Sequence, residues 1–182
     1  MGEKKIIPYI YAENELPQSI AAKAAAYEEA GADELFIYNF SALEQDQEEF
    51  LKAVKAVCKE VEIPVLIGCQ VRRFEDVKKA FYTGAAQVVI PYARLADKSV
   101  IREASMRFGK DKILALLDAG GVGADGAPVP YAEPFEPVAA KDSEAGTVLS
   151  LLKEYGVAGV ILKHVTLTGQ MKERLEASEL PI

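Results

Sequence analysis

The stretch that decides the fold is Glu62–Gln70, EIPVLIGCQ. Pro64 fixes its own φ and biases Ile63 toward extended backbone, so this step predicts the start of a strand. The apolar run that follows, Val65–Ile67, is typical of a strand buried on both faces. Gly68 then allows the backbone to turn away or to approach a ligand closely. The stretch therefore predicts a buried parallel strand that ends in a turn.

Strands and helices alternate along the rest of the chain. The predicted strands are Lys5–Tyr11, Asp33–Tyr38, Pro64–Ile67, Gln87–Pro91, Lys112–Leu117 and Val157–Lys163. The predicted helices are Pro17–Ala30, Glu44–Glu60, Phe74–Tyr82, Lys98–Phe108, Glu144–Tyr155 and Gln170–Glu176. This alternation requires a parallel sheet with right-handed crossovers. Residues 119–141, rich in Gly and Pro, are expected to form a loop or a hairpin insertion.

An internal repeat favours a barrel. Gly31–Leu35 and Gly156–Val160 share one pattern, a helix-ending Gly before a buried strand, and Gly84–Val88 follows it too. The Pro-led phrase of the third strand begins again at Glu179–Ile182. We predict one domain over residues 1–182, an incomplete (βα) TIM-type barrel of about six βα units in a two-half design. A complete barrel takes about 250 residues, so most of units seven and eight would be missing. The alternative, a doubly wound open sheet, predicts no half-repeat.

Composition excludes several classes of protein. The 182 residues are 50% hydrophobic and 27% charged, which is typical of a globular domain. With 21 basic and 28 acidic residues the net charge is −7, which argues against nucleic-acid and membrane-surface partners. Cys58 and Cys69 lack the spacing of a zinc site or a disulfide framework, and no cofactor or metal is predicted. Without a signal peptide or a long apolar span, the expected location is the cytoplasm.

Five segments carry a resemblance to a known family. They are KKIIPYIYAEN (4–14), GADELFIYNFS (31–41), EIPVLIGCQV (62–71), DVKKAFYTGAAQVVI (76–90) and RFGKDKILALLDA (107–119). In this order they resemble the cyclase subunit of imidazole glycerol phosphate synthase, with the sister isomerase of histidine biosynthesis close behind. The chain is also similar to a shortened segment that precedes phosphoribosyl-AMP cyclohydrolase domains. The resemblance implies a histidine-biosynthesis barrel.

The resemblance implies catalysis by two aspartates, at the ends of the first and fifth strands. Such a pair can divide the general acid and base roles. Here Tyr11 holds the first position and Asp118 the second, and Asn39 replaces an aspartate of the family after the second strand. His164, the only histidine, is the candidate to replace the missing group. The loop that carries a catalytic lysine in the family is much shorter here.

The resemblance also implies phosphate binding after the third and fourth strands, by backbone N–H groups. The candidates are Gly68, Gln70 and Arg72, the last suited to bidentate phosphate capture. Pro91, at the end of the fourth strand, has no N–H to donate. A second phosphate site would lie on the missing units. The expected ligand is a phosphorylated ribonucleotide.

Each candidate has a plainer interpretation. Asp118 is typical of a turn before Gly-Gly, and His164 of a partly exposed residue bonded to backbone. Arg72 forms a solvated pair with Arg73 in the plainer account. The strand-end tyrosines Tyr11, Tyr38 and Tyr92 would fill the mouth of a barrel that has lost its substrate. Cys69 has no visible base to activate it as a nucleophile.

Three functions follow from these observations. The first, which we favour, is a degenerate barrel module that is non-catalytic by itself and serves as a scaffold, a dimeriser or a weak phosphosugar binder. The second is an active cyclase or isomerase of a phosphorylated aminoimidazole-carboxamide ribonucleotide that uses Asp118. The third is another phosphosugar-binding barrel, since a fold does not fix its chemistry. An open parallel sheet exposes unpaired edges, so we expect a homo-oligomer or a fused or associated histidine-pathway domain as partner.

Overall fold

The computed structural model describes residues 4–118, 148–163, 173, 176–177 and 179–181. The chain divides into two compact units, each described below by itself. The first contains residues 1–70 and 75–89, and the second residues 71–74 and 90–182. The predicted insertion at 119–141 and most of the predicted helix Gln170–Glu176 lie outside the described residues.

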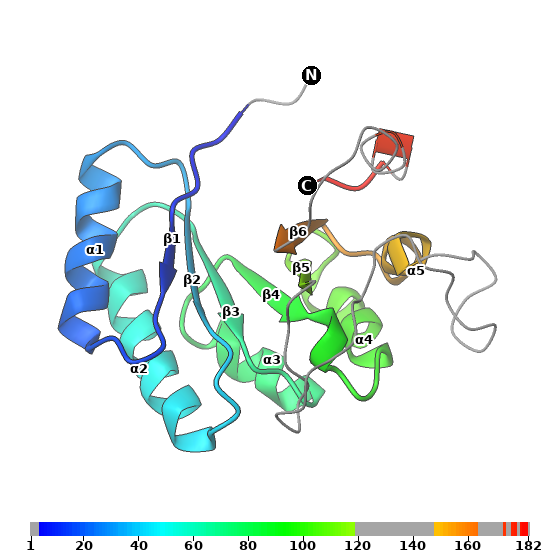
Figure 1. Cartoon of the computed structure of the whole chain (residues 1–182), viewed down its shortest axis with the longest axis horizontal. Helices are drawn as coiled ribbons and strands as arrows, with labels where there is room; N and C mark the ends of the chain where they lie inside the picture. The colour runs from blue at the N-terminus through cyan, green and yellow to red at the C-terminus, as the bar shows by residue number, and fades with distance from the viewer. Residues whose placement is uncertain (1–3, 119–147, 164–172, 174–175, 178, 182) are drawn as a thin grey trace. The chain divides into compact units, whose positions relative to one another are not determined.

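The first unit alternates strands and helices. Its elements are β1 (Tyr9–Tyr11), α1 (Pro17–Glu29), β2 (Leu35–Asn39), α2 (Glu44–Glu60), β3 (Val65–Cys69), α3 (Phe74–Phe81) and β4 (Gln87–Pro91), with the ends of α3 and β4 at the unit boundary. Neighbouring strands are parallel, with Tyr11 opposite Tyr38 and Tyr38 opposite Gly68. Figure 1 shows α1 and α2 together beside β1, β2 and β3. Side chains of both helices and of the strands form a buried core, including Ile20, Leu35, Ile37, Val54 and Ile67.

The second unit repeats the βα pattern. It contains the end of β4, a short 3-10 turn (Tyr92–Arg94), α4 (Ser99–Phe108), β5 (Ile113–Asp118), α5 (Val148–Tyr155) and β6 (Gly159–Lys163). Strands β5 and β6 are parallel, with Asp118 opposite Lys163. The core of this unit includes Ile101, Ile113, Leu117, Leu151 and Leu152.

The strands follow one another in the sheet in chain order, β1-β2-β3-β4-β5-β6. Parallel strands that alternate with helices in this order define an α/β fold of the incomplete TIM-barrel type, as the sequence predicts. The predicted helix ends at Gly31, Gly84 and Gly156 are present with φ between +77° and +96°, a conformation that favours glycine.

The first strand is shorter than predicted, Tyr9–Tyr11 in place of Lys5–Tyr11. Pro8 has no N–H for a ladder, so the regular strand begins after it. The preceding segment still lies along the next strand. The carbonyl oxygens of Ile6 and Pro8 accept hydrogen bonds from the amides of Asp33 and Phe36, at 2.9 and 3.0 Å.

Candidate functional site

Aromatic rings line one face of β1 and β2 along their length and continue just past the end of β2, where the sequence places part of the site. Tyr38 is the centre of this group, which we call the aromatic stack: Tyr9, Tyr11, Phe36, Tyr38 and Phe40. The ring centroid of Tyr38 lies 5.0 Å from that of Tyr11 and 5.1 Å from that of Phe36. Phe40 and Tyr9 follow at 5.5 and 6.0 Å. Residues two apart in a strand share a face, so two strands suffice to build the stack.

Gly68 lies against the aromatic stack. A Cβ atom at this position would lie 2.8 Å from the Cβ of Tyr38 and 2.9 Å from the Cζ of Phe40. These distances are shorter than normal contacts, so the absence of a side chain at Gly68 lets the stack pack on β3. Phosphate binding by Gly68 stays a prediction, and the contacts give this glycine a packing role.

Gln47 of α2 connects the ends of β2 and β3. Its Nε2 donates to the carbonyl oxygens of Asn39 and Ser41, both at 3.0 Å. Its Oε1 accepts a hydrogen bond from the amide of Gln70, also at 3.0 Å. One side chain therefore satisfies three backbone groups at the positions where two strands end, and it fixes the spacing of the loops that follow.

The side chain of Gln70, a predicted phosphate ligand, is buried, and neither its Nε2 nor its Oε1 has a hydrogen-bond partner among the described residues. Buried amide groups are normally paired, because burial without a partner costs the lost bonds to water. A residue that carries such a group at a strand end is a candidate ligand-binding residue. Arg72 is exposed and belongs to the second unit.

In the second unit, Asp118 ends β5 and stands directly opposite Lys163 at the end of β6. The register therefore pairs an acidic position with a basic one at the ends of neighbouring strands. Lys163 was not predicted to have a role of its own, although its position at the end of the sixth strand was a usable signal. His164, the predicted replacement, lies outside the described residues.

The carbonyl groups of the turn after β4 accept hydrogen bonds from a nearby lysine side chain. Nζ of Lys98 donates to the carbonyl oxygens of Tyr92 and Leu95, both at 2.6 Å, and lies 4.5 Å from the ring centroid of Tyr92. Tyr92 itself is buried. After β4, where the resemblance implies phosphate binding, the turn therefore contains a buried aromatic ring and a lysine that is already hydrogen-bonded.

The two units carry the same hydrogen bonds in the same register. In the first unit, the amide of Asp33 donates a hydrogen bond to the carbonyl oxygen of Ile6 at 2.9 Å. In the second unit, the amide of Ala158 donates one to the carbonyl oxygen of Ile113 at 2.7 Å. With this alignment the pair Tyr11–Tyr38 corresponds to the pair Asp118–Lys163. Tyr11 therefore holds, in the first half, the position that Asp118 holds in the second.

Neither cysteine is suited to nucleophilic catalysis. Burial, with a smaller contribution from the charge of Asp76, raises the pKa of Cys69 to about 12. Burial also raises the pKa of Cys58 above its ordinary value. Since the thiolate is the reactive form, both thiols are protonated and unreactive at neutral pH.

Within the described residues, no group of three His, Cys, Asp or Glu side chains converges to hold a metal ion. In the same part of the chain, no helix is long and apolar enough to cross a membrane.

Parallel strands in chain order, with polar and aromatic side chains at their carboxyl ends, define a protein of the α/β-barrel class. The family described as "Histidine biosynthesis protein" matches residues 11–174, most of the chain. The chain belongs to this histidine biosynthesis family. The match confirms the predicted histidine-biosynthesis barrel family, whereas the resemblance to the cyclase subunit and to the shortened segment stays a prediction.

Proposed function

We propose that this chain is a barrel module of the histidine pathway that is non-catalytic by itself and acts by associating with a second copy of itself. A cytoplasmic location is part of this proposal. The observation that carries it is the exposed apolar edge at β1.

The β1 edge is defined here as Ile6, Ile7, Tyr9 and Tyr11. Their exposed fractions are 67%, 42%, 63% and 47%. Strand β1 ends the order of strands, so one side of its backbone lacks a neighbouring strand among the described elements. An edge strand with large exposed apolar side chains is a template for pairing with another chain.

The exchange of a carboxylate for a tyrosine supports the non-catalytic part of the proposal. Tyr11 corresponds in register to Asp118, and its ring stacks on Tyr38 at 5.0 Å. A phenol has a pKa near 10, so it does not replace a carboxylate as a general base at neutral pH.

Light scattering and sedimentation over a wide concentration range test the association. We expect a dimer or larger assembly, and a Tyr9→Lys variant that dissociates at least about tenfold more readily, because the charge would be buried in the contact. Tyr82→Lys is the matched control, since Tyr82 is 73% exposed and follows α3. A monomeric wild-type chain at every concentration would overturn the proposal.

The register pairing of Asp118 with Lys163 favours a second candidate, an active cyclase or isomerase of a phosphorylated aminoimidazole-carboxamide ribonucleotide. An amine and a carboxylic acid at neighbouring strand ends can divide acid and base roles. Turnover of that substrate by the wild-type chain, lost in Asp118→Asn and in Lys163→Met but kept in Asp111→Asn, would replace the first proposal with this one.

The buried, unpartnered amide of Gln70 supports weak binding of such a ribonucleotide without turnover. Calorimetry with the bisphosphorylated ribonucleotide, and with inorganic phosphate as control, measures this binding. Binding that exceeds phosphate alone and is lost in Gln70→Met would assign Gln70 to the ligand. Equal heats for both ligands would limit the module to association.

A further inference from the structure

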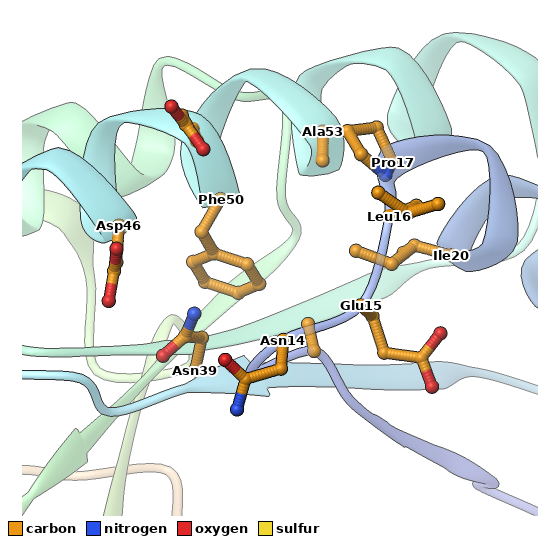
Figure 2. A pocket seen from close by; sticks show the side chains of 11 residues that line it. Asn14, Glu15, Leu16, Pro17, Ile20, Asn39, Asp46, Phe50 and Ala53 are labelled. Atoms are coloured by element: carbon orange, nitrogen blue, oxygen red, sulfur yellow. The ribbon is translucent and has the colours of Figure 1, made fainter.

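The first unit contains a cavity of about 250 Å³ on the helix side of the strand ends. It lies between the loop that follows β1, the start of α1, the end of β2 and the first half of α2 (Figure 2). Pockets that bind small molecules have volumes of about 300–1,000 Å³, so this one suits a small ligand.

The cavity has an apolar floor. The side chains of Ile20, Phe50 and Ala53 line it, and each is at most 5% exposed. They belong to the interface between α1 and α2. A ligand with a short hydrocarbon chain would remove apolar surface from water here.

The rim is acidic. Glu15, Asp46 and Glu49 line the cavity, and no basic residue does among the described ones. Glu15 is paired with Lys23. Asp46 accepts a hydrogen bond from Ser41 Oγ at 2.7 Å, and Glu49 a long one from Gln45 at 3.4 Å, but neither forms an ion pair in the described part of the chain. Asp46 and Glu49 are three residues apart on α2, so they lie on one side of the helix.

A second, independent observation points to a ligand. Asn39 is 5% exposed and lines the cavity. Its Oδ1 accepts the amide of Ser41 at 2.8 Å, whereas its Nδ2 makes no hydrogen bond to any described residue. Figure 2 shows the Asn39 amide beneath the ring of Phe50, with Asp46 and Glu15 on opposite sides of the cavity. Nδ2 is not among the fully buried atoms without a partner in the described residues, so it reaches the surface of the cavity, where an acceptor on a ligand can bind it.

We propose that this cavity binds a small organic amine that carries a hydrogen-bond acceptor. Its ammonium group lies at the carboxylates of Asp46 and Glu49, its hydrocarbon part on Phe50 and Ile20, and its acceptor at Nδ2 of Asn39. A metal ion is the poorer occupant, because the carboxylates do not converge into a coordinating group in the described residues.

No residue of the β1 edge lines the cavity, and neither do the predicted phosphate ligands Gly68 and Gln70. The proposed amine site can therefore be tested independently of the proposed association. An acidic cavity also disfavours a phosphorylated ligand, whose negative charge the carboxylates would repel.

The probe is aminopentanol, with its amine and hydroxyl at opposite ends, titrated into the full chain and followed by NMR. We expect a dissociation constant on the order of 1 mM and a shift of the side-chain NH₂ signal of Asn39. Pentanediol, which has no charge, is expected to bind at least about tenfold more weakly. Added salt is expected to weaken the binding of aminopentanol but not that of pentanediol.

The matched variants are Glu49→Gln and Glu48→Gln. Both residues are exposed carboxylates of α2, but only Glu49 lines the cavity. We expect Glu49→Gln to weaken amine binding several-fold and Glu48→Gln to leave it unchanged. Equal weakening by both variants, or no shift of the Asn39 NH₂ signal at saturating amine, would overturn the proposal and reduce the effect to non-specific charge attraction.

Discussion

The amide of Val160 donates a hydrogen bond to the carbonyl oxygen of Pro181 at 2.8 Å. The amide of Leu35 makes the same bond to Pro64 in the other half of the chain, at 2.9 Å. Leu35 and Val160 end two of the three copies of the Gly-led pattern, and Pro64 and Pro181 belong to the two Pro-led phrases. The half-repeat of the sequence is therefore also a repeat of hydrogen bonds.

The contact between Gly159 and Pro181 makes Gly159→Ala destabilising. A Cβ atom would lie 2.6 Å from the carbonyl oxygen of Pro181, a backbone atom that cannot rotate away. We expect a loss of about 1–3 kcal/mol in the free energy of unfolding, measured with denaturant. An unchanged unfolding midpoint would show that Pro181 does not hold this position in solution.

The Gly68→Ala variant distinguishes a packing role of Gly68 from a role in phosphate binding. The added methyl would meet the Cβ of Tyr38 at 2.8 Å, so packing predicts a loss of about 1–3 kcal/mol in stability and a change in the near-ultraviolet circular dichroism of the tyrosines. If Gly68 served only phosphate binding, the variant would keep its stability and lose affinity for phosphate.

Apolar substitutions at Gln47 and at Gln70 should have different effects on the stability of the protein. Gln47→Leu leaves the amide of Gln70 and the carbonyl groups of Asn39 and Ser41 unpaired, so we expect a loss of about 1–3 kcal/mol. Gln70→Met removes a buried amide that has no partner, so we expect neutral or higher stability. Denaturant unfolding of both variants measures the difference, and a destabilised Gln70→Met would mean that this amide is paired in solution.

Glu15 should make stability depend on acid pH. Hydrogen bonds from Lys23 and Ser19 lower the pKa of Glu15 below its ordinary 4.5. A lowered pKa adds stability above the unfolded pKa, and this stability is lost as the pH falls through the folded value. The effect is small and weakened by salt, because the carboxylate is exposed. Unfolding of wild type and Glu15→Gln should differ at neutral pH and converge at acid pH; a constant difference would contradict this.

Cys69 should resist alkylation in the folded protein. Its pKa of about 12 leaves almost no thiolate at pH 8, and the side chain is buried. We expect iodoacetamide to modify Cys69 only after unfolding, as followed by mass spectrometry of its peptide. Labelling of the native protein at the rate of a free thiol would show that β3 opens readily.

Most of the secondary structure could be predicted from the sequence. Proline and glycine mark where strands and helices begin and end, and apolar runs identify the buried strands, because these effects act within a few residues. The predicted helix Glu44–Glu60 and the predicted strand Gln87–Pro91 have the predicted bounds. The first strand was predicted too long, because the hydrogen bonds between the residues around Pro8 and the next strand depend on the tertiary fold.

The sequence by itself determined the alternation of strands and helices, the half-repeat and the family. Only the tertiary structure decided what the side chains at the strand ends do. It placed Gly68 against Tyr38, Gln47 between two strand ends, Lys163 opposite Asp118, and Asn39 at a cavity. The physical reason is that hydrophobic periodicity fixes the face on which a residue lies, whereas its partners depend on strand register and on the rotation of a packed helix, which join residues far apart in the chain.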